Sequence, residues 1–414
     1  MSEVINSLSE LSAEEKRAML TELLRKQSPA PKAKQFPLSL AQQRLWFLYQ
    51  LEPDNPFYNV PYAMRLSGTL NIGVLERSLS EIVRRQWSLR TTFPVVNHEA
   101  MQSVSPAQPL TLPVVDLSSV PDKETDAQHF ILQEARQVFD LTSGPLLRAK
   151  LLRLSEDEHI LVLVMHHIVS DGWSNSILFR ELTALYRAYL DGRESPLEEL
   201  SIQYADYAVW QREGLHGEVL AEQLSYWRER LEGVAVLELP TDHPRPAVQR
   251  YRGSRQTSVI ERSVSAGLHE LARREGATLF MVLLAGWQAL LSRYSGQTDI
   301  CVGTPIAGRS RRELEGLIGF FINTLVMRTE VRGEESFREL VGRVREASLG
   351  AYEHQEVPFE KLVEELQPER DASRNPLFQV AFTLDTATKG ALEFPGLKLS
   401  PVKIDTGSVQ FDLM

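Results

Sequence analysis

The sequence has a single cysteine, Cys301, among 414 residues, so no internal disulfide can form. The lack of paired cysteines is typical of a protein from a reducing compartment. The chain also has no apolar run close to the roughly 20 residues that a membrane-spanning helix needs. Its N-terminus, MSEVINSLSELSAEEKR, lacks the basic-then-apolar order of a secretory signal peptide. We therefore expect a cytoplasmic protein without a membrane segment.

An excess of positive charge is absent as well. The net charge is −10, whereas nucleic-acid-binding domains normally carry a basic surplus, so we expect no nucleic-acid partner. Local basic residues at 309, 311 and 312 are interpreted as solvated surface. The composition, 43% hydrophobic and 24% charged, is ordinary for a globular protein. The length suffices for one or two domains, each with its own core.

The first 35 residues are predicted to be an appendage. Residues 11–26 read as a short amphipathic helix, for which Ser12 and Glu15 form a capping box. Residues 27–35, QSPAPKAKQ, have the composition of an extended or mobile linker. This appendage either docks a partner chain or is a frayed terminal helix. The body of the protein is expected to begin near Phe36.

Patterns in the body predict a mixed α/β (α+β) fold in two halves. The N-terminal half, 36–232, contains two predicted strands, Leu146–Arg153 and His159–Met165, and then a helix that Ser174 or Asn175 caps and Gly192 ends. A proline-rich connection over 233–256 leads to a second α/β half at 257–414. The elements expected in that half are helices at 264–276, 278–295, 336–352 and 358–366 and a strand at Asp299–Val302.

The stretch VLVMHHIVSDGWSNS, residues 162–176, presents two histidines at the end of an apolar strand. A strand-to-helix loop of this kind places a reactive side chain on a rigid support. Neutral His167 can accept a proton from a nucleophile that attacks a carbonyl, and Asp171 follows four residues later. No GxSxG elbow accompanies the pair, so no serine is marked as an enzyme nucleophile. The pattern favours direct acyl transfer to a nucleophile that the substrate brings.

Three other interpretations of this stretch remain open. The two histidines can be hydrogen-bonded structural residues. His166, His167 and Asp171 can bind a metal, although adjacent histidines rarely face one ion and no HExxH motif or cysteine cluster is present. Asp171 can be a local turn former, since Asp-Gly is a strong turn dipeptide.

HHIVSDGWS resembles the HHxxxDG motif of condensation domains of nonribosomal peptide synthetases, which belong to the chloramphenicol acetyltransferase-like acyltransferases that share HxxxD. Further stretches resemble the other condensation-domain motifs, in the family's order and across almost the whole chain. They are SLAQQRLWF (39–47), PFYNVP (56–61), SLRTTF (88–93), YADYAVWQ (204–211), IGFFINTLVMR (318–328), NPLFQVAF (375–382) and QFDLM (410–414).

The sequence departs from the family pattern in places. Arg85, Gln86 and Trp87 stand where the family tends to have Arg-His-Glu. Gln410 stands where a lysine is common, and Arg374 where a histidine or asparagine is frequent. Family members also continue beyond the seventh motif, so the resemblance implies a C-terminal half that is truncated here.

The resemblance implies two chloramphenicol acetyltransferase-like lobes that form a V-shaped pseudo-dimer around a central tunnel, and it implies amide formation. His167 would position the attacking amine and accept its proton. Asp171 would be a structural carboxylate that pairs with an arginine, with Arg309 the first candidate and Arg90 the second. Gly172 would let the backbone approach the reacting atoms, so that a side chain there would obstruct the tunnel.

Other residues receive supporting roles from the same resemblance. His166 would hold the loop, and Asn323, in the fifth motif, would support the site. Trp46, Tyr58 and Phe320 are interpreted as core aromatics.

The implied partners are a donor and an acceptor carrier protein, whose 4'-phosphopantetheine arms enter the tunnel, and the adenylation domain of the same synthetase. The start at Met1 suggests a donor carrier on another polypeptide, with residues 1–30 as a docking segment. No permanently bound cofactor or metal is expected.

Two other functions are compatible with this sequence: an acyl-CoA-dependent acyltransferase of the same fold, and a non-catalytic docking module that recruits carrier proteins. Epimerisation and heterocyclisation relatives are disfavoured by Gly172 and by the two histidines, respectively. The identities of donor and acceptor stay open.

Overall fold

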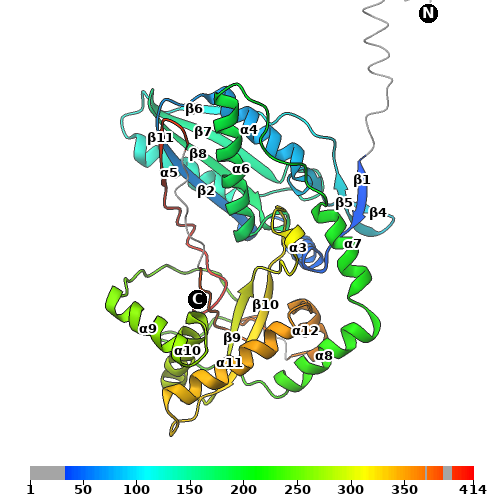
Figure 1. Cartoon of the computed structure of the whole chain (residues 1–414), viewed down its shortest axis with the longest axis vertical. Helices are drawn as coiled ribbons and strands as arrows, with labels where there is room; N and C mark the ends of the chain where they lie inside the picture. The colour runs from blue at the N-terminus through cyan, green and yellow to red at the C-terminus, as the bar shows by residue number, and fades with distance from the viewer. Residues whose placement is uncertain (1–32, 369–370, 386–393) are drawn as a thin grey trace, which may run out of the picture.

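The computed structural model describes residues 33–368, 371–385 and 394–414. Two lobes lie one above the other in Figure 1, and the chain's C-terminal end lies between them. The expected helix at 11–26 falls outside the described residues. The observed α/β content and two-lobed form agree with the predicted fold class.

The upper lobe is built on a five-stranded sheet of order β11-β2-β8-β7-β6. A smaller sheet, in which β5 pairs with β1, β3 and β4, lies beside it. The strands are β1 (Lys34–Pro37), β2 (Asn59–Gly68), β3 (Thr91–Thr92), β4 (Val95–Val96), β5 (Glu99–Val104), β6 (Val114–Asp116), β7 (Leu147–Ser155), β8 (Glu158–His166) and β11 (Leu397–Pro401). The helices are α3 (Leu40–Leu51), η1 (Pro56–Tyr58), α4 (Ile72–Arg85), η2 (Trp87–Arg90), α5 (Lys123–Arg136), η3 (His167–Val169), α6 (Gly172–Leu190) and α7 (Tyr204–Gly214).

Strand β8 is apolar from Ile160 to Met165 because both faces of the central sheet are covered. Its side chains alternate between two cores, as the period of two in a strand requires. Leu161, Leu163 and Met165 join the core that contains residues of α4 and α6. Ile160 and Val164 join the core that contains residues of α3 and α5. The strand that carries the histidine pair is thus fixed from both sides.

The lower lobe packs helices around a two-stranded antiparallel sheet of β9 and β10. Its elements are α8 (Gly217–Leu231), α9 (Arg262–Arg274), α10 (Leu279–Ser295), β9 (Asp299–Ile306), η4 (Arg312–Leu314), β10 (Asn323–Glu330), α11 (Phe337–Glu353) and α12 (Phe359–Leu366). The predicted helices and strand of the second half are confirmed, with bounds that differ by at most four residues. The predicted strand pair of the first half is confirmed as β7 and β8.

The division between the lobes differs from the expected boundaries 36–232 and 257–414. Helix α8 belongs to the lower lobe, where Leu224 and Trp227 are part of the hydrophobic core. The chain therefore crosses between α7 and α8, ahead of the proline-rich stretch 233–256. It crosses back near its end, because β11 pairs antiparallel with β2 of the upper sheet. Strand β1 also begins at Lys34, within the expected linker.

No single helix in the described part of the chain is long and apolar enough to cross a membrane. Helices α9 and α10 pass that test of length and composition only as a pair, and they are bent by 106° relative to each other.

Candidate active site

The histidine pair lies where β8 gives way to α6. His166 is the last residue of β8, His167 begins the short turn η3, and Gly172 is the first residue of α6. His166 is 6% exposed, whereas the His167 side chain is partly accessible. The two adjacent residues therefore differ in their exposure to solvent.

His166 is a structural residue of the loop. Its Nδ1 accepts the backbone N–H of Ile168 at 3.1 Å, and its ring lies 6.0 Å from that of Phe139, edge to face. Burial lowers the pKa of His166 to about 3, and the positive charge of Arg148 and that of His167 when protonated act in the same direction. The geometry agrees with the expectation that His166 holds the loop.

His167 is held as a neutral ring, and its Nε2 has no hydrogen-bond partner among the described residues. Its Nδ1 lies 2.7 Å from the carbonyl oxygen of Ser170. Because a carbonyl oxygen only accepts, Nδ1 must carry the proton, which leaves the lone pair on Nε2. Burial lowers the pKa of His167 below its usual 6.5, although the Ser170 bond and Asp171 partly oppose this shift. At neutral pH the ring can accept a proton at Nε2.

Asp171 is fully buried, and the hydrogen bonds of its carboxylate to described residues go to Ser174, Arg309 and Phe321. It caps α6 by accepting the backbone N–H of Ser174 at 2.8 Å and its hydroxyl at 2.7 Å. The expectation that Ser174 or Asn175 caps this helix is therefore wrong, whereas the expected stop at Gly192 holds, two residues after the helix ends. Since His167 Nδ1 bonds a backbone carbonyl instead, no Ser–His–Asp relay is formed.

Arg309 is the arginine that pairs with Asp171. Its Nη1 and Nη2 donate to the two carboxylate oxygens at 2.8 and 3.1 Å, and the Phe321 N–H donates to the same carboxylate at 3.1 Å. The Arg309 side chain is 2% exposed, so it is not the solvated surface residue that its basic neighbourhood suggested. The second candidate partner, Arg90, is wrong, because this arginine donates to the carbonyl of Ser105 and lies over the Trp87 ring.

Neither Asn323 nor Gly172 forms a hydrogen bond with the His167 side chain in the structure. Asn323 fastens the start of α12 to β10, donating to the carbonyls of Gln355 and Val357 at 2.9 and 2.7 Å and accepting from the Phe359 N–H at 3.0 Å. At Gly172, an added Cβ would meet no protein atom within 4 Å. The space beside Gly172 is open, and its use by a substrate stays a prediction.

Residues of three other motifs lie around the loop, and two of them, Gln42 and Tyr204, were not singled out by sequence reasoning. Gln42 of α3 donates to the carbonyl of Ile168 at 3.1 Å. Tyr204 of α7 donates to the carbonyl of Phe320 at 2.6 Å and accepts from the Ser39 hydroxyl at 2.8 Å. The Phe320 ring lies 5.0 Å from the His167 ring, so it is more than the core aromatic that was expected. In the sequence, these residues could have been found by their positions in the family motifs, because residues of several motifs lie around this one loop.

Gln86, which departs from the family pattern, also forms hydrogen bonds with the backbone of another motif region. Gln86 is 1% exposed, accepts the N–H of Ile318 at 2.9 Å and donates to the carbonyl of Gly316 at 3.1 Å. Ser88 donates to the carbonyl of Ile318 at 2.7 Å. The second motif thus binds the backbone of the fifth.

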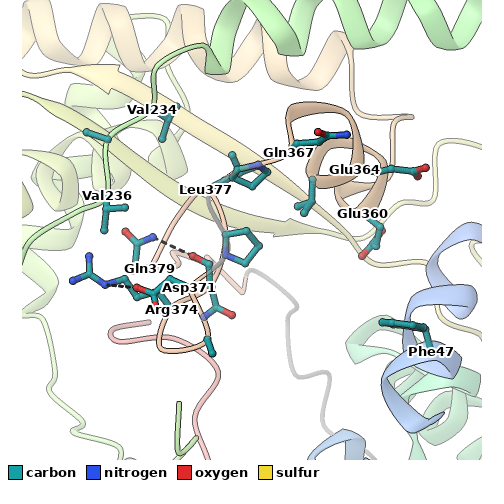
Figure 2. A pocket seen from close by; sticks show the side chains of 16 residues that line it. Phe47, Val234, Val236, Glu360, Glu364, Gln367, Asp371, Arg374, Leu377 and Gln379 are labelled. Atoms are coloured by element: carbon teal, nitrogen blue, oxygen red, sulfur yellow. Dashed lines mark hydrogen bonds and ion pairs between the residues drawn. The ribbon is translucent and has the colours of Figure 1, made fainter. Parts of the chain in front are cut away.

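A cavity of about 1480 Å³, whose lining residues are drawn in Figure 2, includes neither His166 nor His167 in its lining. Figure 2 shows Val234 and Val236 on one side and Glu360 and Glu364 of α12 on the other, with Phe47 of α3 below the two glutamates. A second cavity of about 30 Å³ lies between α3, α7 and the start of α12. His167 lines neither, so the expected tunnel stays a prediction. Among the described residues, no group of three His, Cys, Asp or Glu side chains is arranged to hold a metal ion.

Comparison with known proteins matches this architecture to one family. The profile of the condensation domain covers residues 32–414. The chain is 51% identical over 376 residues to a polypeptide of linear gramicidin synthase from Brevibacillus parabrevis, covering 90% of this chain and 5% of that polypeptide. It is 43% identical over 390 residues to a dimodular nonribosomal peptide synthase of Bacillus subtilis, covering 93% of this chain and 16% of that protein.

Solved structures give the same result. The X-domain from teicoplanin biosynthesis superposes with a TM-score of 0.82 at 31% identity, covering 93% of this chain and 85% of that one. A four-domain nonribosomal peptide synthetase bound to AMP and glycine gives a TM-score of 0.81 at 25% identity, covering 93% of this chain and 30% of that one. The chain thus spans a small part of the curated relatives, and it belongs to the condensation-domain family of nonribosomal peptide synthetases.

Proposed function

We propose that this chain forms an amide bond between a donor acyl thioester and the α-amine of an acceptor aminoacyl thioester. Both substrates would be tethered to the 4'-phosphopantetheine arms of carrier proteins in a cytoplasmic synthetase, beside the adenylation domain. The observation that carries the proposal is the free Nε2 of His167, which the Nδ1 bond to Ser170 leaves as the acceptor. No resident cofactor or metal is part of the proposal.

The reaction proceeds by direct transfer. The acceptor nitrogen attacks the donor carbonyl, a C–N bond forms, and the nitrogen loses a proton to Nε2 of His167. The C–S bond then breaks, and the donor arm leaves as a thiolate that takes up the proton from His167, which returns the ring to its neutral form. An α-amino group titrates near pH 7.7 to 8.0, so a useful fraction is already neutral. His167 therefore acts mainly by positioning the amine and accepting its proton.

The contribution of His167 to the rate should have the size that is typical of general acid–base catalysis. Removal of His167 should cost roughly 10²- to 10⁴-fold in rate. The remaining acceleration comes from holding two tethered reactants together. The buried pair of Asp171 and Arg309 keeps the loop in place and takes no part in proton transfer.

The test supplies loaded donor and acceptor carriers and follows the acceptor by intact-protein mass. The chain is assayed as wild type and as His167→Ala, with an acyl-CoA donor in a parallel reaction. Transfer from the carrier that falls sharply in His167→Ala supports the proposal. Turnover of acyl-CoA in place of the loaded donor carrier would identify the acyl-CoA-dependent enzyme instead.

A non-catalytic docking module is the second candidate. A 31%-identical X-domain superposes with a TM-score of 0.80 in a structure that contains its complex with OxyB. The orientation of His167 towards proton acceptance weighs against a purely docking role here. Binding of both carriers without any acyl transfer would favour the docking function.

A further inference from the structure

The segment 316–321 lies in the connection between β9 and β10 of the lower lobe. Side chains of the upper lobe nevertheless form hydrogen bonds with its backbone. Ile318 is held from both sides by Gln86 and Ser88. The remaining contacts are those of Ser174 with Gly319, Tyr204 with the Phe320 carbonyl and Asp171 with the Phe321 N–H. This segment is therefore fixed relative to the histidine loop through a succession of hydrogen bonds.

Tyr204 is the residue that sets the position of Phe320. Its side chain is 1% exposed, and its hydroxyl has only one proton, which goes to the Phe320 carbonyl at 2.6 Å. The Ser39 hydroxyl, at 2.8 Å, must then donate to the tyrosine oxygen. The Tyr204 ring lies against Gly319, where an added Cβ would overlap the ring. Tyr204 thus holds the segment by a hydrogen bond and by close packing.

Phe320 in turn limits the orientation of the His167 ring. The two ring centroids are 5.0 Å apart with an interplanar angle of 69°. The single ring hydrogen bond to Ser170 fixes where Nδ1 lies, but it leaves the imidazole free to tilt about that bond. An aromatic ring packed edge to face against the imidazole opposes this tilt and excludes water from that side.

We propose that Phe320 is a positioning residue for His167, and that Tyr204 acts through Phe320. This inference rests on the proposed function and names two residues that the reaction needs without their touching the reacting atoms. Nε2 must point at the amine when the carbonyl is attacked, and a misplacement of about 1 Å can cost roughly 10²-fold in rate. A side chain of the lower lobe, Phe320, thereby helps to orient the imidazole of His167 in the upper lobe.

The test compares Phe320→Leu and Tyr204→Phe with wild type in the two-carrier assay. Phe320→Leu keeps an apolar side chain, and Tyr204→Phe keeps the ring against Gly319 but removes the hydroxyl. We expect kcat to fall about 10- to 100-fold in Phe320→Leu and less in Tyr204→Phe, because orientation of the acceptor group is lost. KM for each carrier should stay within about twofold of wild type, since neither residue binds a carrier in this proposal.

A second readout separates positioning from loss of structure. Asp171, which is paired with Arg309 and acts on the pKa of His167, and the adjacent His166 are both unchanged in Phe320→Leu. Better access of water to the imidazole should move the acid limb of the kcat profile to higher pH. Phe130→Leu, a partly buried phenylalanine on α5, is the matched control and should behave as wild type.

Several results would overturn the inference. Unchanged kcat in both folded variants would do so, and so would a loss of kcat that only follows a lower fraction of folded protein. Should Phe320→Leu fail to fold, Tyr204→Phe decides alone. Failure of the proposed function looks different: wild type and His167→Ala would then be equally inactive, whatever the state of Phe320.

Discussion

Asp171 and Arg309 are 138 residues apart in the sequence and form a bidentate ion pair that is almost completely buried. One residue caps the helix that follows the histidine loop, and the other follows β9 of the lower lobe. Removing two charges from water is costly, and the cost is offset only by good geometry and further hydrogen bonds. Ser174 and Phe321 provide those bonds to the carboxylate. The pair therefore joins the two lobes at the base of the candidate site.

Replacing Asp171 should damage folding as well as turnover. In Asp171→Asn the side chain can no longer compensate Arg309, whose charge stays buried. Breaking a buried pair by changing one partner typically costs about 3–5 kcal/mol. We expect the free energy of unfolding, measured by chemical denaturation, to fall by about that amount, and the yield of folded protein to fall with it.

Asp191→Asn is the control at the other end of the same helix. Asp191 pairs with Arg193 at 2.6 Å, but both side chains are more than half exposed. An exposed pair contributes at most about 1 kcal/mol. Normal stability of Asp171→Asn together with lost activity would argue for a direct chemical role of the carboxylate.

His166 should make the folded protein sensitive to acid. Burial lowers the pKa of folded His166 to about 3, whereas the unfolded chain binds this proton near pH 6.5. Between these values the unfolded state carries the extra proton, so the free energy of unfolding falls by about 1.4 kcal/mol for each unit of decrease in pH. His166→Asn can still accept from the Ile168 N–H but does not titrate. Its stability should therefore depend less steeply on pH.

The measurement is chemical denaturation of wild type and His166→Asn at several pH values between 6.5 and 4. The difference between the two slopes isolates His166 from the carboxylates that titrate in the same range. Parallel curves would show that His166 becomes protonated in the folded protein.

Local patterns predicted the elements of this fold because each pattern depends on neighbouring residues. The apolar run at 159–165 and the periodic residues after it gave β8 and α6, and so placed the histidine pair in its loop. Periodicity does not say which core an element joins. Helix α8 was therefore assigned to the wrong lobe: its Trp227 packs in the hydrophobic core of the lower lobe. Strand β11 was missed because its pairing with β2 brings together segments more than 300 residues apart.

The candidate site, like the fold, was predicted only in part from the sequence. His167 and the pairing of Asp171 with Arg309 followed from the motif and its family resemblance, and the structure brings the latter two together. The role of Phe320 did not follow, because an aromatic residue in an apolar stretch has no local feature that separates packing from contact with a histidine. The cap at Asp171 was overlooked because two later polar residues also fit a helix start.

Gly172→Ala should separate packing within the protein from use of the space by a substrate. An added Cβ meets no protein atom within 4 Å, and alanine is the better helix former, so stability should stay within about 1 kcal/mol of wild type or rise. If an acyl group occupies this space, product formation in the two-carrier assay should fall while the protein stays folded. Gly319→Ala is the comparison, since its Cβ would overlap Tyr204 and should cost about 1–3 kcal/mol in stability. Full activity of Gly172→Ala would show that the substrate does not use this space.

The tautomer of His167 can be observed directly. In the chain labelled with ¹⁵N-histidine, and assigned with His167→Ala, we expect a protonated Nδ1 and an unprotonated Nε2 at neutral pH, because Nδ1 donates to Ser170. Burial lowers the pKa of this ring below 6.5, so the unprotonated Nε2 should persist as the pH falls to that value and should be lost only below it. The acid limb of the two-carrier reaction should follow the same titration, since protonated Nε2 cannot accept the amine proton. A proton on Nε2 at neutral pH would contradict both the tautomer and the role of His167 as acceptor.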